Sequence, residues 1–280
     1  MLKQYLRSAA ILACVIGLPM RAETIYLPVV SRATAPVPSD TWGLQDATWK
    51  STLSVSNPTS NTLTFRLLRL FGGRSPRIEV GCAGENLRVP PETSWDLSSI
   101  GYGGCVRPGS EPAMLEIDLD AGLLVSGGVH LAVARYCWSE PRPETLSLAA
   151  APLPAYQGLF PAGATAVSVD IAFPHEPQKP RECVDETDAV TRRVNVTLFN
   201  GGASAATFTI APVGGALAPL ALELAPGAVL QLNDIYPTGR YRVLLVSADA
   251  PFLCYASSVT TWADPKRPPS IGVYPFRPIP

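Results

Sequence analysis

The sequence predicts an all-β protein that consists of a signal peptide followed by two tandem antiparallel β-sandwich domains. Apolar and polar residues alternate with a period of two, as at Leu115, Ile117 and Leu119, which is the pattern of a half-buried strand. Turns rich in proline, glycine and asparagine separate these runs, and no window between them holds a capped helix of about ten residues. An internal repeat is the third observation, and it divides the chain into two copies of one pattern.

Residues 1–22 have the order of a secretory signal peptide. Lys3 and Arg7 precede an apolar run from Ala9 to Pro19, and Ala22 offers a small residue for cleavage. The run is shorter than the roughly 20 residues that span a bilayer. We therefore expect no transmembrane span and a secreted, periplasmic or cell-surface location.

The composition suits a globular exported protein. Hydrophobic residues make up 47% of the 280 residues, charged residues make up 16%, and the formal net charge is −1. The chain can bury a core, and it lacks the basic surface that nucleic-acid binding requires.

The two copies align in blocks that keep the same order along the chain. Asn57 lies over Asn200 at a turn, and Trp138 lies over Trp262 near the end of each copy. The aligned blocks are 52–70 with 195–213, 87–100 with 222–235, and 138–142 with 262–266. Fixed-order self-similarity of this kind indicates a duplicated structural unit.

The repeat and a Pro/Ala-rich stretch together predict the domain boundaries. We expect domain 1 at 23–150, a stiff connector at 151–156, and domain 2 at 157–280. Each domain should contain about seven strands in two packed sheets.

Each copy contains a strand, a turn at asparagine and a second strand. The segments are Val55-Ser56-Asn57-Pro58 and Leu198-Phe199-Asn200-Gly201, and Ala225-Pro226-Gly227 forms a later turn. This pattern resembles the immunoglobulin-like modules, such as fibronectin type III and cell-adhesion-related domains, that recur in exported bacterial proteins. The resemblance implies a binding or spacer role. Such modules share no site motif, so no ligand-binding residue carries over.

The cysteines suggest disulfides, because an exported protein folds in an oxidising compartment. Cys82 and Cys105 lie in the two insertions of the first copy, so we predict a bridge between them. Cys183 lies in the insertion of the second copy and can pair with Cys137 or Cys254. Cys254 also falls at an inward strand position, which favours a buried free thiol. No Cys-x-x-Cys pair is present, and we expect no metal and no cofactor.

Carboxylates on one predicted strand are the best candidates for catalysis. A period of two places Glu116, Asp118 and Asp120 on one face, about 6 to 7 Å apart. Such a group could serve a hydrolase or a calcium site. The second copy has Leu245 and Ser247 at the first two positions, so we expect a solvated strand face instead.

No nucleophile elbow, zinc-protease motif or phosphate-binding loop is present. His130 alternates with apolar neighbours, and we expect it to point outward. Substitution of His130, Glu116 or Asp118 should then leave any activity of the protein nearly unchanged, with effects on stability of no more than about 0.5 kcal/mol.

Two pairs of side chains are candidate ligand contacts. Trp42 and Trp49 could stack on sugar rings, or they could anchor the entry of a strand. Arg66 and Arg69 could bind acidic glycans, or they could be scattered solvated charges.

These observations favour a non-enzymatic surface, adhesion or scaffolding module. Its expected partner is a protein or glycan of the cell envelope or of the extracellular space. The principal alternative is a carbohydrate-binding accessory module, and a hydrolase that uses Glu116 and Asp118 is the third.

We predict that peptide mapping under non-reducing conditions will recover Cys82 linked to Cys105. Closing a loop of this length would stabilise the fold by roughly 3 kcal/mol in the chain-entropy model. A Cys82 peptide that is free, or that is linked to another cysteine, would contradict the prediction.

Overall fold

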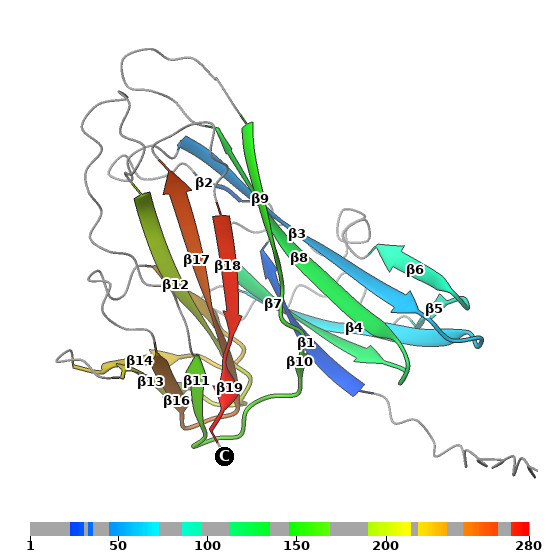
Figure 1. Cartoon of the computed structure of the whole chain (residues 1–280). Helices are drawn as coiled ribbons and strands as arrows, with labels where there is room; N and C mark the ends of the chain where they lie inside the picture. Colours follow the sequence, from blue (N-terminus) through cyan, green and yellow to red (C-terminus); the bar gives the residue numbers. More distant parts are fainter. Residues whose placement is uncertain are drawn as a thin grey trace, which may run out of the picture.

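The computed structural model describes ten segments of the chain. They are residues 23–30, 33–35, 45–72, 86–96, 112–134, 146–168, 190–213, 218–233, 243–262 and 270–279. Every regular element in these segments is a β-strand, and every strand pair is antiparallel (Figure 1). The predicted all-β class is therefore confirmed.

Strands β1 to β9, which we call the N-terminal half, build most of two sheets. Sheet 1 has the order β10 (Tyr156–Gln157), β1 (Glu23–Val30), β7 (Pro112–Leu119), β4 (Leu63–Gly72) and β5 (Asn86–Val89). Sheet 2 has the order β2 (Ala33–Ala35), β3 (Gln45–Asn57), β8 (Leu124–Ala134) and β9 (Leu146–Pro152), and β6 (Thr93–Asp96) also pairs with β3.

Strands β11 to β19, which we call the C-terminal half, build the other two sheets. Sheet 3 has the order β14 (Leu220–Leu224), β13 (Ala206–Pro212), β16 (Leu244–Ala248), β11 (Thr165–Ser168) and β19 (Arg277–Pro278). Sheet 4 has the order β15 (Val229–Asn233), β12 (Val190–Asn200), β17 (Phe252–Trp262) and β18 (Ser270–Pro275).

The same pairing pattern occurs in both halves. In sheet 1, β7 lies between β1 and β4, and in sheet 3, β16 lies between β11 and β13. Sheets 2 and 4 share the pairing of a long central strand with β8 or β17. The registers agree as well, because Val55 opposes Trp95 and Leu198 opposes Leu230. Positions of one half can therefore be compared with positions of the other, strand by strand.

Each half buries the apolar face of its two sheets in a hydrophobic core, as β-sandwiches do. In the N-terminal half, the fully buried residues Leu27, Val55, Phe65 and Ile117 come from both sheets. The C-terminal core contains, among others, Val196, Leu198, Phe208, Ile210, Val246 and Phe252. Period-two alternation produces these faces, since successive strand residues point to opposite sides of a sheet.

The asparagine that defines the repeat organises the same turn in both halves. Asn57 Nδ2 donates to the carbonyls of Asn61 and Val89, at 2.7 and 2.8 Å. Asn200 Nδ2 donates to the carbonyls of Ser204 and Leu224, both at 2.9 Å. Both side chains are buried, and each ties a turn to the end of a neighbouring strand. This buried bonding explains why asparagine stands at both positions.

The two halves are packed against each other. The core of the C-terminal half includes Tyr26, Phe71 and Met114, which lie on the outer face of sheet 1. The ring of Phe199, on the outer face of sheet 4, lies 4.8 Å from the Phe71 ring and 6.0 Å from the Tyr26 ring, measured between centroids. Strands β9 and β18 also lie side by side (Figure 1). The outer faces of sheets 1 and 4 thus form an interface within the chain.

The chain passes between the halves along this interface. Residues 151 and 152 end β9, and β10 begins at Tyr156 and pairs with β1, where Tyr156 opposes Tyr26. The Tyr156 hydroxyl donates to the carbonyl of Cys254 at 2.9 Å. The segment predicted to be a connector is therefore bonded to both halves at its end.

Several predictions fall on residues outside the described segments. They are the signal peptide at 1–22, the cysteines Cys82, Cys105, Cys137 and Cys183, and the tryptophans Trp42 and Trp138. Trp49 lies in β3 opposite Leu131. Among the described residues, no helix is long and apolar enough to cross a membrane.

Glu92 occupies a turn position at which the other half has glycine. Its φ is 53°, and the aligned Gly227 has a φ of 70°. The left-handed region costs a residue with a Cβ about 1 to 2 kcal/mol, whereas glycine enters it freely.

We predict that Glu92→Gly will stabilise the protein by up to about 1 kcal/mol, after the extra flexibility of glycine in the unfolded chain is subtracted. Gly227→Ala is the matched control and should destabilise the C-terminal half by a similar amount. Urea denaturation of the variants measures both effects. A loss of stability in Glu92→Gly would show that the turn gains nothing from glycine.

Candidate functional site

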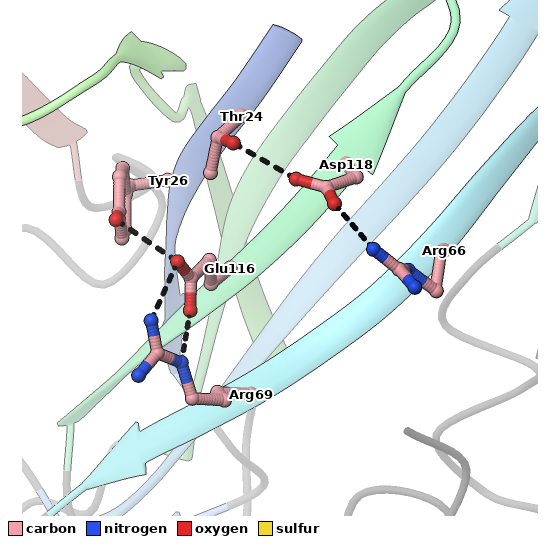
Figure 2. Close-up of polar contacts among 6 residues, drawn as sticks. All are labelled: Thr24, Tyr26, Arg66, Arg69, Glu116 and Asp118. Carbon is pink, nitrogen blue, oxygen red and sulfur yellow. Dashed lines mark hydrogen bonds and ion pairs between the residues drawn. The ribbon is translucent and has the colours of Figure 1, made fainter. Parts of the chain in front are cut away.

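A cluster of polar residues lies on the outer face of sheet 1 (Figure 2). We call it the sheet 1 cluster, and its members are Thr24 and Tyr26 from β1, Arg66 and Arg69 from β4, and Glu116 and Asp118 from β7. Strand β7 lies between the other two strands, and its two carboxylates oppose Tyr26 and Thr24 on one side and the two arginines on the other. The cluster brings together the carboxylates, which the sequence offered as candidates for catalysis, and the arginines, which it offered as candidate ligand contacts.

A β-bulge in β4 brings the two arginines onto one face. The register shifts between Leu67 and Arg69, so that Arg66 opposes Asp118 and Arg69 opposes Glu116. Strict alternation would place Arg66 and Arg69 on opposite faces, because they are three residues apart. An extra residue in one strand re-aims the side chains that follow it, and here it turns Arg69 and Phe71 outward.

Both carboxylate oxygens of Glu116 are engaged. Oε1 accepts hydrogen bonds from the Tyr26 hydroxyl at 3.0 Å and from a terminal nitrogen of Arg69 at 2.9 Å, and Oε2 accepts one from Arg69 Nε. Only 3% of the residue is exposed. The prediction that Glu116 lies on a solvated strand face is therefore wrong. The reason is tertiary, because the C-terminal half covers this face and its core includes Tyr26 and Met114.

The environment of Glu116 fixes the protonation of its partners. Burial, together with the negative charge of Glu116, raises the pKa of Tyr26 to about 12. The hydrogen bond to Glu116 raises the pKa of Arg69 above its ordinary value. The Arg69 guanidinium also lies 5.1 Å from the centroid of the Phe71 ring, within the range of a cation–π contact. Tyr26 therefore keeps its proton and donates a hydrogen bond to Glu116, and Arg69 supplies the counter-charge.

Asp118 and Asp120 also have structural partners. Asp118 accepts hydrogen bonds from Thr24 Oγ1 at 2.8 Å and from Arg66 at 2.9 Å, and this pair is partly exposed. Asp120 Oδ2 accepts from the backbone N–H and the hydroxyl of Thr64, both at 2.7 Å. Its counterpart Asp249 accepts from the N–H of Thr207 at 2.8 Å. The role of Asp120 is therefore repeated in the second half and belongs to the fold.

The ion pairs weaken the case for the two arginines as contacts for an anionic ligand. Each has a carboxylate partner, and the exposed fractions of the Arg66 and Arg69 side chains are 44% and 52%. A ligand anion would therefore meet charges that are already neutralised by Asp118 and Glu116.

A hollow on the outer face of sheet 2 was not found from the sequence. Its volume is about 370 Å³, and its lining consists of Thr52, Leu53, Ser54, Asp96, Ser126, Gly127 and Gly128. The hydroxyls of Ser54 and Ser126 lie 2.7 Å apart across the strands. A Cβ on Gly127 would lie 2.8 Å from a methyl carbon of Leu53, so glycine allows the close packing beneath the hollow. The Gly127-Gly128 pair inside a predicted strand is the sequence feature that could have indicated this hollow, because glycine within a strand often marks a close approach.

His130 is exposed on the same face of sheet 2, and its Nε2 lies 3.0 Å from Thr52 Oγ1. The prediction that His130 points outward is confirmed.

Cys254 is a buried free cysteine, as its inward strand position predicted. Burial raises the pKa of its thiol well above the ordinary value, which keeps it protonated and unreactive.

The architecture defines the chain as an all-β protein built from antiparallel sheets with buried inner faces. No protein-family model matches the sequence, and no curated protein matches it.

Three solved structures show weak similarity. The protein 1070 of Thermotoga maritima covers 42% of this chain and 96% of its own, with 11% identity and a TM-score of 0.31. A mutant of the major pilin from Streptococcus pyogenes covers 86% of this chain and 82% of its own, with 9% identity and a TM-score of 0.18. An anti-sigma factor domain-containing protein covers 91% and 97%, with 11% identity and a TM-score of 0.11. Similarities at this level carry no argument about fold or function.

We predict that Arg69→Gln will destabilise the protein by about 2 to 3 kcal/mol, because it leaves the buried carboxylate of Glu116 without its counter-charge. Arg66→Gln is the matched control on the same strand, and it should cost less than about 1 kcal/mol because its partner Asp118 is partly solvated. Equilibrium unfolding in urea measures both. Equal costs for the two variants would contradict the structural role of Glu116.

Proposed function

We propose that the chain is an exported tandem of two immunoglobulin-like β-sandwich modules and that it functions as a non-enzymatic surface, adhesion or scaffolding module. In this proposal it binds another macromolecule of the cell envelope or of the extracellular space. The repeated strand order supports the tandem, and the signal-peptide pattern of residues 1–22 supports export.

The observation that carries the proposal is the state of Glu116. Glycoside hydrolysis requires one carboxyl group that gives a proton and a second that acts as base or nucleophile. Glu116 is buried and bonded through both oxygens to Arg69 and Tyr26, and Asp118 is paired with Arg66. These carboxylates link β7 to its two neighbouring strands, β1 and β4, which is a structural use.

The interface between the halves is consistent with a scaffolding role. Phe199 packs on Phe71 and Tyr26, so the halves resist independent rotation. Two modules held in this way would present their loops and outer faces at a fixed spacing. Less conformational entropy is then lost when a partner binds both modules.

Carbohydrate binding is the second candidate, and the hollow on sheet 2 favours it. Hydroxyls of Thr52, Ser54 and Ser126 and the carboxylate-bearing Asp96 line this hollow. Hydroxyl and carboxylate groups can exchange hydrogen bonds with the hydroxyls of a sugar. The aromatic rings that would add stacking, Trp42 and Trp49, have no described side chains.

The proposal predicts that the immobilised chain will retain a defined macromolecule from native envelope extract and will hydrolyse no member of a polysaccharide panel. Mass spectrometry of the retained material and reducing-end assays are the measurements. Hydrolysis that Asp118→Asn abolishes would overturn the proposal in favour of a hydrolase.

A glycan array separates the two binding candidates. Ser126→Tyr fills the hollow on sheet 2, and Asn86→Tyr places the same side chain on the exposed edge strand β5 as a control. Loss of glycan binding in Ser126→Tyr alone would establish the carbohydrate-binding function. Retention of an envelope protein by both variants would support the adhesion or scaffolding role.

A further inference from the structure

The outer face of sheet 4, which packs on sheet 1, carries three buried polar side chains. They are Asn195 and Thr197 of β12 and Tyr255 of β17. All three lie on the same side of the sheet as Phe199, because β12 alternates with a period of two and Tyr255 opposes Thr197. Asn195, Thr197 and Tyr255 are 2%, 1% and 3% exposed. The packing of the two halves therefore encloses polar groups as well as aromatic rings.

One polar atom of each of these side chains is unpaired. Asn195 Oδ1, Thr197 Oγ1 and the Tyr255 hydroxyl have no hydrogen-bond partner in the described part of the chain. In the same segments, the only other buried side-chain atom of this kind is Ser168 Oγ, which belongs to sheet 3. Burial raises the pKa of Tyr255, and the nearby Thr197 hydroxyl lowers it in part. The unpaired atoms thus gather on one face of one sheet.

Three unpaired atoms on one covered face are unusual for a folded protein. A buried polar atom without a partner keeps the whole free-energy cost of its desolvation. Nearly all such atoms in native structures are bonded to the protein or to ordered water. Three of these costs together would remove a large part of the small net stability of a domain. The outer face of sheet 4 therefore calls for a partner that the chain itself does not supply.

The equivalent face of the N-terminal half shows how polar groups at these positions are satisfied. The registers match them to three hydroxyl residues that line the hollow on sheet 2, which are Thr52, Ser54 and Ser126. The hydroxyls of Ser54 and Ser126 lie 2.7 Å apart, and Thr52 Oγ1 lies 3.0 Å from His130 Nε2. Both halves thus place polar side chains at the same positions, and within the described residues only the covered set is unpaired.

The chemistry of the three atoms identifies their partner. Asn195 Oδ1 can only accept a hydrogen bond, whereas the hydroxyls of Thr197 and Tyr255 can donate or accept one. The amide oxygen would repel an anion, and the three groups include no carboxylate of the kind that binds calcium or magnesium. A water molecule can donate two hydrogen bonds and accept others. It therefore suits one acceptor and two hydroxyl groups.

We infer that the outer face of sheet 4 binds an ordered water molecule between the two halves, through Asn195 Oδ1, Thr197 Oγ1 and the Tyr255 hydroxyl. Buried waters typically make about three hydrogen bonds to protein groups that are otherwise unpaired. This water links side chains of β12 and β17 beside the contact of Phe199 with sheet 1. The inference concerns the interior of the chain and does not depend on the external partner proposed above.

Magnetic relaxation dispersion of water oxygen tests the inference directly, because it counts water molecules that stay bound to the purified chain for longer than nanoseconds. We expect the double variant Thr197→Val with Tyr255→Phe to lose at least one such water. Thr207→Val is the matched control, since Thr207 is an exposed threonine of β13 in the same half. It should lose none. Circular dichroism confirms that each variant is folded.

Urea denaturation of the single variants separates a hydrated site from a dry one. Removing a hydroxyl that is bonded to water loses a hydrogen bond and lowers the urea midpoint, whereas removing a buried unpaired hydroxyl raises it. We expect Thr197→Val and Tyr255→Phe each to lower the midpoint. A midpoint that stays or rises in either variant overturns the inference. Retention of every long-lived water by the double variant also overturns it, as does an equal loss in Thr207→Val.

Discussion

The packing of Phe199 onto sheet 1 is the contact on which much of the remaining structure depends. It joins the C-terminal core to Tyr26, Phe71 and Met114, and it turns an outer sheet face into a buried one. Once this face is covered, any charge on it must be paired, since an unpaired buried carboxylate costs several kcal/mol. Arg69 and Tyr26 meet that requirement for Glu116.

The bulge in β4 is the local feature that makes this arrangement possible. It places Arg69 beside Glu116 and Phe71 beside Met114 on the covered face. In β13, the equivalent strand, residues pair with β16 without a register shift, and Thr209, Ala211 and Leu245 replace the charged residues. The same fold therefore carries ion pairs and aromatic contacts at the centre of one sheet face and uncharged residues at the equivalent central positions of its counterpart.

The two halves show which residues serve the fold and which serve one half alone. Asn57 and Asn200 make the same hydrogen bonds, and Asp120 and Asp249 both accept from a matched threonine. Pairs that recur in this way belong to the common scaffold. Glu116, Arg69 and the serines of the sheet 2 hollow have no such counterparts, so they reflect what each half packs against or leaves open.

The sequence by itself determined the β-class, the inward and outward faces and the turn asparagines, because alternation with a period of two and turn chemistry are local properties. It placed Cys254 inside and His130 outside correctly for the same reason. It placed Glu116 outside, which is true of its own sheet but not of the whole molecule. Only the tertiary structure decided that Glu116 is buried. Alternation distinguishes the two faces of a sheet, but it carries no information about which distant segment covers either one.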